Sequence, residues 1–122
     1  MLGDGRVMPY GTMGGEGQPQ TQAMLFTRHV HYQQSLQESV TAPRWLLGKT
    51  WGSDNTNLRI ESGFDESVYA QLIAAEHDVE RVGAFEEFMG HAGALVLHTK
   101  GEQQGMIEGA YDPRSDGKVA AF

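Results

Sequence analysis

The 122-residue sequence contains no cysteine. A chain without thiols cannot form a disulfide, cannot bind zinc through thiolates and cannot use a cysteine nucleophile. The composition leaves open whether the protein works in a reducing or an oxidising compartment.

Basic residues are scarce as well. Nine Lys and Arg stand against 16 Asp and Glu, which gives a formal net charge of -7. Phosphate binding needs clustered Lys and Arg, whereas the basic residues here are scattered along the chain. The charge therefore argues against nucleic acid and against an anionic membrane surface as partners.

Long hydrophobic runs are also missing. No apolar run approaches the roughly 18 residues that a membrane span needs. Residues 1–20 have neither the basic region nor the apolar region of a signal peptide. The default expectation is a cytoplasmic protein, although a signal upstream of this sequence would change it.

Glycine, by contrast, is abundant. The chain has 16 glycines, about twice the usual share of roughly 7%. They cluster in 3–17, 83–105 and 109–117, which indicates tight turns between short elements. Because the length suits one modest core and no linker divides the chain, we expect a single domain over residues 1–122.

Turn residues and apolar spacing predict an alternation of short strands and helices. Pro19 suits a first helical turn, where its missing N–H would be unbonded. Ala23, Phe26 and Val30 follow with helical spacing, and Asp65 is the expected N-cap of a later helix. The expected elements are a strand at 6–10, helices at 18–31 and 36–41, a strand at 57–61, a helix at 66–76, and strands at 78–82, 92–99 and 105–110.

This order predicts an α+β fold with helices on one face of a mainly antiparallel sheet. Residues 92–96 are apolar at nearly every position, so both faces of that strand need burial. A sheet with helices on one side needs its other face covered or polar. The pattern therefore indicates a missing layer.

The most informative motif is MPYGTMGGEGQPQ at residues 8–20, a glycine-dense turn that leads into a helix. Such a junction can point backbone N–H groups at a negative charge, although a tight turn without a ligand also explains it. With VTAPR at 40–44, the Phe64-Asp65 pair and GAYDPRSDG at 109–117, the motif resembles the C-terminal part of the small subunit of γ-glutamyltransferases. The residues of the MPYGTMGGEGQPQ motif are more similar to a bacterial branch that includes oxamate amidohydrolase-like proteins than to typical glutathione-cleaving members.

The resemblance implies part of one layer of an N-terminal-nucleophile hydrolase, an αββα sandwich. In that family a precursor cleaves itself, and the new N-terminal threonine attacks an amide carbonyl with its own α-amine as base. A Gly-Gly pair holds the tetrahedral oxyanion through backbone N–H groups, and the matching pair here is Gly14 and Gly15. The threonine and the large subunit lie upstream in the family, so we expect this chain to be inactive alone.

Several polar residues near the motif allow a catalytic interpretation but favour a simpler one. Thr12 is internal, and its hydroxyl is expected to stabilise the turn. His29 and His31 have the spacing of metal ligands on a strand, but on a helix their rings diverge by roughly 200°, so we expect surface histidines. His91 is expected to be an exposed loop residue, with a pocket-facing role as the alternative.

The remaining candidates also have structural explanations. Glu86, Glu87 and the acidic run at 76–80 are expected to form a solvated charged face instead of a carboxylate pair. Trp45 and Trp51 are expected to be core or interface aromatics.

The run at 112–117 is expected to be a structured turn and not a catalytic site. In it, Asp112 and Asp116 would accept backbone N–H bonds, and Arg114 would pair with either carboxylate. No residue pattern calls for a cofactor or a metal ion, and we expect neither.

Three functional hypotheses follow. The first is a fragment of a γ-glutamyltransferase-like amide hydrolase or transferase, with an upstream segment or large subunit as its partner. The second is a stand-alone interaction module in which a second copy covers the open sheet face. The third is a pseudoenzyme that binds small acids at the glycine turn.

Overall fold

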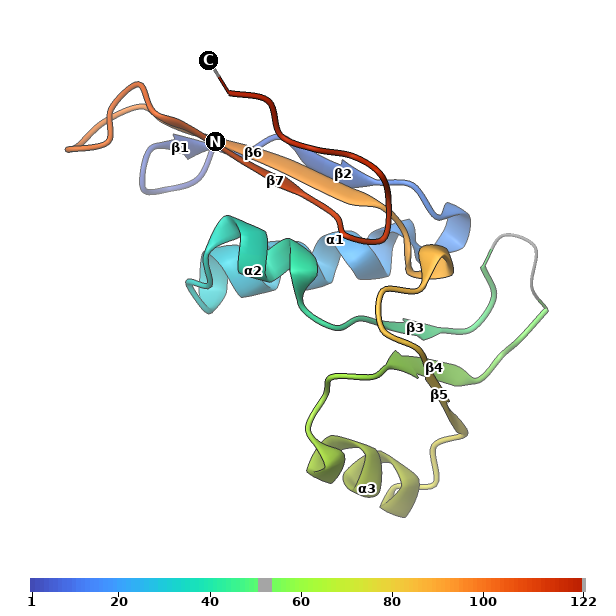
Figure 1. The fold of residues 1–122 in the computed structure, drawn as a ribbon. Coiled ribbons are helices and arrows are strands. Elements are labelled where there is room, and N and C mark those ends of the chain that lie inside the picture. Colours follow the sequence, from blue (N-terminus) through green and yellow to red (C-terminus); the bar gives the residue numbers. More distant parts are fainter. Residues whose placement is uncertain (51–53, 122) are drawn as a thin grey trace.

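The computed structural model describes residues 1–50 and 54–121. Two sheets lie on opposite sides of a helical layer: a larger sheet above α1 and α2, and a smaller sheet that carries α3 below them (Figure 1). The strands are β1 Arg6–Val7, β2 Tyr10–Thr12, β3 Trp45–Leu47, β4 Leu58–Glu61, β5 Val79–Val82, β6 Ala92–His98 and β7 Ile107–Tyr111. The α-helices are α1 Gln18–Phe26, α2 Leu36–Thr41 and α3 Glu66–Ala74.

The larger sheet is built around β6, which pairs antiparallel with β1, β2 and β7. The predicted hairpin of the last two strands is confirmed, with Leu97 opposite Ile107. The predicted strand at 6–10 is two shorter strands that pair with successive parts of β6.

The smaller sheet corrects the expectation of one sheet. Its β3 pairs antiparallel with β4, and β4 pairs parallel with β5 through the crossover that contains α3. The three residues of β3 had not been predicted as a strand, because a run this short shows no alternation. Trp45 is half-buried in this strand, and Trp51 lies outside the described residues.

The first helix is confirmed, but its predicted apolar stripe is wrong. Ala23 is exposed, whereas Thr21, Leu25 and His29 are buried. These three lie four residues apart, and a π-helical turn at Thr27–His31 continues α1 so that His29 stays on the buried side. The expectation of a surface histidine at 29 is therefore wrong, whereas His31 is exposed as expected.

Side-chain caps mark the starts of the other two helices. Ser35 and Glu38 form a capping box that opens α2. Asp65 accepts a hydrogen bond from the Ser67 N–H at the start of α3, as expected.

The core lies between the larger sheet and the helices α1 and α2. Its apolar side chains come from those helices and from alternate positions of β6 and β7: Leu25, Leu36, Val40, Ala92, Ala94, Val96 and Ala110. The outward positions of the same strands stay exposed, with Leu95 48% and Ile107 65% exposed. Helices thus cover one face of this sheet, as predicted, and its other face is apolar and largely open.

A short segment after β7 covers part of the outer face. It runs back along the larger sheet (Figure 1), and Val119 lies against Gly109 and Leu95. Leu97 and Tyr111 remain 36% and 44% exposed on this side.

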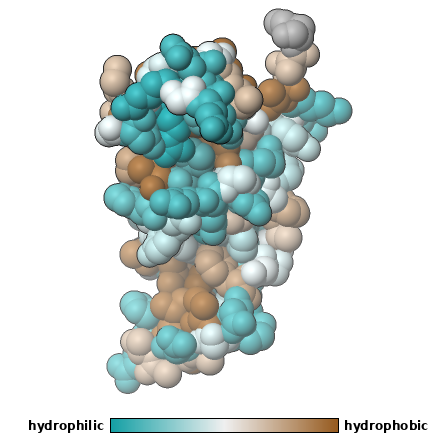
Figure 2. Space-filling model, turned by 90° about the vertical axis from the view of Figure 1, so that its left-hand side faces the viewer, coloured by the Kyte–Doolittle hydropathy of each residue, from teal (hydrophilic) through white to brown (hydrophobic). Residues whose placement is uncertain are grey.

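A second apolar surface lies at the opposite end of the molecule. A groove of about 370 Å³ separates α3 from the smaller sheet and is lined by Trp45, Leu47, Leu58, Ile60, Phe64, Val68 and Leu72. Figure 2 shows hydrophobic residues gathered in the lower part of the molecule, towards α3.

Candidate functional site

The glycine turn lies between the end of β2 and the start of α1. Gly14 has φ 130° and Gly15 has φ 53°, in the left-handed region that favours glycine. A 3-10 turn at Gly15–Gly17 then leads directly into α1. Among the described residues, the N–H groups of Gly14 and Gly15 have no hydrogen-bond acceptor. The turn therefore offers two adjacent donors at the N-terminal end of a helix, where an anion is stabilised.

The carbonyl groups of the turn are bound from within the protein. The Gly14 oxygen accepts a hydrogen bond from Gly17 N–H at 2.9 Å and from the Thr50 hydroxyl at 3.2 Å. In a planar trans peptide the C=O and the next N–H point in opposite directions. The bonds to the Gly14 carbonyl therefore direct the Gly15 N–H away from Gly17 and Thr50.

The segment before β6 packs directly against this turn. A Cβ atom on Gly90 would lie 2.6 Å from the Met13 carbonyl oxygen, so only glycine fits there. Gly90 also has φ 86°, which side chains disfavour. His91 carbonyl accepts the Met13 N–H at 3.4 Å, and the Thr21 hydroxyl donates to the Met89 carbonyl at 3.0 Å.

A cleft of about 360 Å³ opens beside the turn. Its lining residues are Met13, Gly14, Thr50, Glu86, Glu87 and Phe88. A larger groove of about 850 Å³ lies between α2 and the connection from β4 to α3, and its lining includes no residue of the glycine turn.

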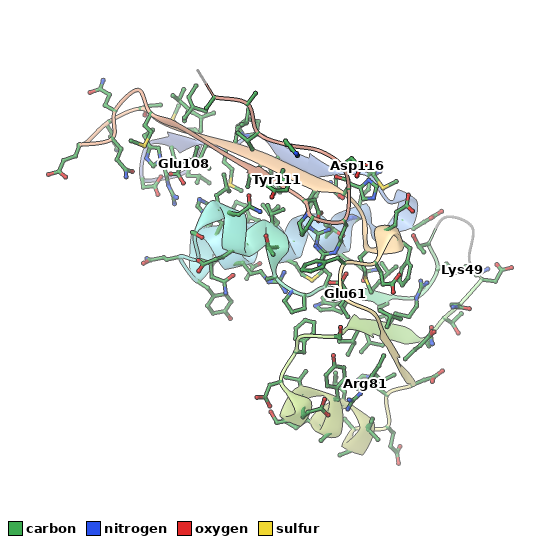
Figure 3. All side chains as sticks on the ribbon, in the orientation of Figure 1. Lys49, Glu61, Arg81, Glu108, Tyr111 and Asp116 are labelled. Atoms are coloured by element: carbon green, nitrogen blue, oxygen red, sulfur yellow. The ribbon has the colours of Figure 1, made fainter. Side chains whose placement is uncertain are left out.

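Two arginines and two carboxylates form a buried network. Arg44 pairs with Asp112 at 2.6 Å, and Arg114 pairs with Asp112 at 3.0 Å and with Glu61. All four side chains are at most 2% exposed. Figure 3 shows Glu61 at the centre of the molecule, between the helical layer and the smaller sheet.

The network also ties backbone segments together. Arg44 donates to the carbonyls of Gly90 at 2.6 Å and Val40 at 3.0 Å. Asp112 accepts the Ala92 N–H at 2.6 Å. The network therefore joins α2, the start of β6 and the end of β7, and Arg44 reaches the segment that packs under the glycine turn.

The two guanidinium groups respond differently to their surroundings. Burial lowers the pKa of Arg44, with Asp112 opposing this and Arg114 adding to it. Burial would also lower the pKa of Arg114, but its bonds to Glu61 and the charges of Glu61 and Asp112 outweigh burial and raise it. Both groups stay charged at any ordinary pH, so the buried charges balance.

The structure confirms the expected role of Thr12, whose hydroxyl donates to the Met13 carbonyl at 2.7 Å. It corrects the expectation for His91, which is half-buried, because the loop packs against the glycine turn. Within the described part of the chain, the buried His91 Nε2 has no hydrogen-bond partner.

The acidic candidates separate in the structure. Glu87 and the run at 76–80 are largely exposed, as expected. Glu86 is half-buried, contrary to expectation, because its carboxylate accepts the Gly83 N–H and its own N–H donates to Glu61.

The run at 112–117 is a structured turn, as predicted. Asp112 accepts the N–H of Ala92 and of Arg114. Asp116 is exposed, and Arg114 pairs with Glu61 in its place, because Arg114 points inward from the turn. Glu61 and Arg44 lie far from this turn in the chain, so neither was predicted as a partner of Arg114 or Asp112.

His29 has a structural role on the far side of α1. Its Nε2 lies 2.9 Å from the Arg6 guanidinium, which can only donate, so Nε2 accepts. Its Nδ1 then donates to the Gln34 carbonyl at 2.9 Å. Among residues 1–50 and 54–121, no three His, Asp or Glu lie close enough together to hold a metal ion. No helix in these ranges is long and apolar enough to span a bilayer.

A protein-family model described as Gamma-glutamyltranspeptidase matches residues 1–122. The chain belongs to the gamma-glutamyltranspeptidase family. This confirms the resemblance carried by the glycine turn and the ending at 109–117.

Two curated relatives support this membership. The oxamate amidohydrolase proenzyme of Klebsiella pneumoniae is 53% identical over 121 residues, which are 99% of this chain and 22% of that protein. The glutathione hydrolase-like YwrD proenzyme of Bacillus subtilis is 42% identical over 113 residues, which are 93% of this chain and 21% of that protein. The chain therefore spans about a fifth of the length of these relatives.

A solved structure supports the fold. The Bacillus anthracis transpeptidase enzyme CapD superposes on this protein with a TM-score of 0.78 at 23% identity. The match covers all of the present chain and 68% of the CapD chain. The family's fold and the mixture of helices with mainly antiparallel strands confirm the predicted α+β class.

Proposed function

We propose that this chain forms the C-terminal part of the small subunit of an amide hydrolase or transferase and supplies its oxyanion hole. Gly14 and Gly15 are the donors. The observation that carries the proposal is the pair of adjacent N–H groups at the entrance to α1, which have no acceptor among the described residues. Family membership gives these donors a reaction in which an oxyanion forms.

The chemistry would proceed by attack of a hydroxyl on an amide carbonyl. The carbonyl oxygen gains negative charge as the tetrahedral intermediate forms, and two fixed N–H groups stabilise that charge more than they stabilise the neutral ground state. Loss of one such donor typically costs about 2.7–4 kcal/mol of transition-state stabilisation.

The nucleophile would come from another segment. In the family the nucleophilic threonine lies upstream of the Gly-Gly pair, and it gains the free α-amine that acts as base only when the precursor cleaves itself. Both curated relatives are described as proenzymes, and each is about five times as long as the matched region. We therefore infer that the chain is inactive alone and active only with the segment that its relatives carry in addition.

The open face of the larger sheet is the surface on which that segment would pack. Leu95, Leu97, Ile107 and Tyr111 project there and are 36–65% exposed. A contiguous apolar patch on a protein surface is typical of an interaction site. The substrate would be a small amide or a γ-glutamyl compound, since the relatives' names refer to oxamate and glutathione.

The test is reconstitution. The 122-residue chain would be co-expressed with the Klebsiella oxamate amidohydrolase proenzyme truncated before the matched region, and turnover of oxamate and of a γ-glutamyl anilide measured. We expect no turnover from either part alone and turnover from the pair. Gly15→Val should abolish it, whereas Gly3→Val, at an exposed glycine with no neighbour within 4 Å, should not. Turnover by the chain alone that is lost in Gly15→Val would refute the inactive-alone proposal.

The same open face also supports the second hypothesis, a module that self-associates. A second copy would cover Leu95 and Ile107 through an isologous contact. Sedimentation of a compact monomer at micromolar concentration would count against it. Shifts of the Gly14 and Gly15 amides on titration with glutamate or oxamate would instead support the small-acid-binding alternative.

A further inference from the structure

The orientation of the Gly15 N–H depends on a side chain far away in sequence. Gly14 and Gly15 both have φ values open to glycine and unfavourable for other residues. The peptide between them could therefore rotate and exchange the positions of its C=O and N–H at little steric cost. Such a rotation would turn the Gly15 donor towards the interior and place a carbonyl oxygen where the anion should bind.

Two hydrogen bonds oppose this rotation, and both end on the Gly14 carbonyl. One comes from the Gly17 N–H at 2.9 Å and is part of the 3-10 turn. The other comes from the Thr50 hydroxyl at 3.2 Å. Thr50 is only 6% exposed, so water competes little for its hydroxyl.

Thr50 reaches this carbonyl because the end of β3 packs beside the turn. Gly17 is buried, and a Cβ atom on it would lie 3.0 Å from Leu46 and 3.7 Å from the Thr50 hydroxyl oxygen. The strand and the turn are thus in close contact, and Thr50 also lines the cleft next to Gly14.

We propose that Thr50 is a positioning residue of the oxyanion turn: its hydroxyl holds the Gly14 carbonyl inward and thereby directs the Gly15 N–H away from Gly17 and Thr50. The proposal rests on the proposed function of Gly14 and Gly15. It assigns to Thr50 no contact with substrate. Its effect passes through one peptide plane, so loss of the hydroxyl should change the rate of the chemical step more than the binding of substrate.

The first arm of the test needs no activity. The measurement is NMR spectroscopy of the isotope-labelled 122-residue chain. Thr50→Val removes the hydroxyl donor and keeps the shape of the side chain, whereas Thr50→Ser keeps the donor. We expect the chemical shifts of the Gly14 carbonyl carbon and of the Gly15 amide to change in the valine variant and to stay near their original values in the serine variant. Thr56→Val, at an exposed threonine, is the matched control. Unchanged Gly14 and Gly15 resonances in Thr50→Val would overturn the proposal.

A measurement on the unchanged chain covers the case in which the valine variant does not fold. A donating, buried Thr50 hydroxyl should exchange slowly enough with water to show a cross-peak to the Gly17 amide. A hydroxyl proton in fast exchange would contradict the proposal.

The second arm uses the reconstituted enzyme. Loss of one hydrogen bond of ordinary strength should lower kcat by up to about tenfold in Thr50→Val, with KM nearly unchanged and recovery in Thr50→Ser. Inactivity of the unchanged pair would count against the proposed function and leave the first arm to decide the role of Thr50. An active pair in which Thr50→Val keeps full kcat would overturn that role alone.

Discussion

Replacement of Glu61 by Gln should destabilise the chain strongly. The Glu61 carboxylate accepts four hydrogen bonds: from the backbone N–H of Arg44 and of Glu86, and from Nε and Nη2 of Arg114. The amide of Gln keeps one oxygen and presents an NH2 group to these donors, so donors lose their acceptors. The substitution also removes one of the two negative charges that balance the two buried guanidinium groups of Arg44 and Arg114.

The expected size follows from the burial. Breaking a buried ion pair by removing one partner costs about 3–5 kcal/mol, because the other charge stays buried. Unfolding entropy of roughly 2.1 cal/mol/K per residue gives about 0.26 kcal/mol/K for 122 residues. A loss of 4 kcal/mol therefore corresponds to a fall in Tm of about 15 °C.

The measurement is thermal and urea unfolding followed by circular dichroism. Glu66→Gln is the matched control, because Glu66 pairs with Arg81 at 2.8 Å on the surface, where their side chains are 78% and 49% exposed. That pair should contribute less than about 1 kcal/mol. If Glu61→Gln destabilised the chain no more than Glu66→Gln, the buried pairing of Glu61 with Arg114 would contribute no more than an exposed ion pair, and the reasoning would be refuted.

Two further predictions concern a glycine and an acid. Gly90→Ala should destabilise the chain by more than about 1 kcal/mol, because Gly90 has φ 86° and an added Cβ would lie 2.6 Å from the Met13 carbonyl oxygen. The control is Gly93→Ala, where an added Cβ meets open space, and it should change the free energy of unfolding by less than about 1 kcal/mol. Equal urea midpoints for the two variants would contradict this prediction. Hydrogen bonds from Ser67 lower the pKa of Asp65, so its contribution is present above the unfolded value near 3.8 and is lost as the pH falls through the lower folded value. Between about pH 6 and about pH 2.5 the urea midpoint should therefore fall less in Asp65→Asn than in the unchanged chain. An equal fall in the two proteins would argue against a cap at Asp65.

Elements set by local chemistry could be predicted closely. The bounds of α2 follow from the cap at Ser35 and from Pro43, which disfavours helix at Ala42. The start of α3 follows from Asp65. In each case the deciding contact lies within a few residues of the element, so the printed order of residues already contains it.

Contacts between distant segments could not be predicted in this way. Arg114 has Asp112 and Asp116 as sequence neighbours, yet its second partner is Glu61, which lies 53 residues earlier. The burial of His29 depends on a π-helical turn that keeps it in line with Thr21, and helical spacing alone does not predict that turn.

The residues of the candidate site also differ in whether the sequence alone could predict them. Gly14 and Gly15 were found because a family resemblance carries the whole motif. Thr50 was not found, because only the folded chain brings it against the Gly14 carbonyl.

The distance between Glu61 and Arg114 has a consequence for biosynthesis. Ribosomes add about 5–20 residues per second, so Arg114 emerges roughly 3–10 s after Glu61. During that interval the carboxylate of Glu61 has no guanidinium of Arg114 to pair with, and β6 has no β7 beside it. The nascent chain would therefore expose the future junction of its two sheets for seconds, a period in which a chaperone can bind it.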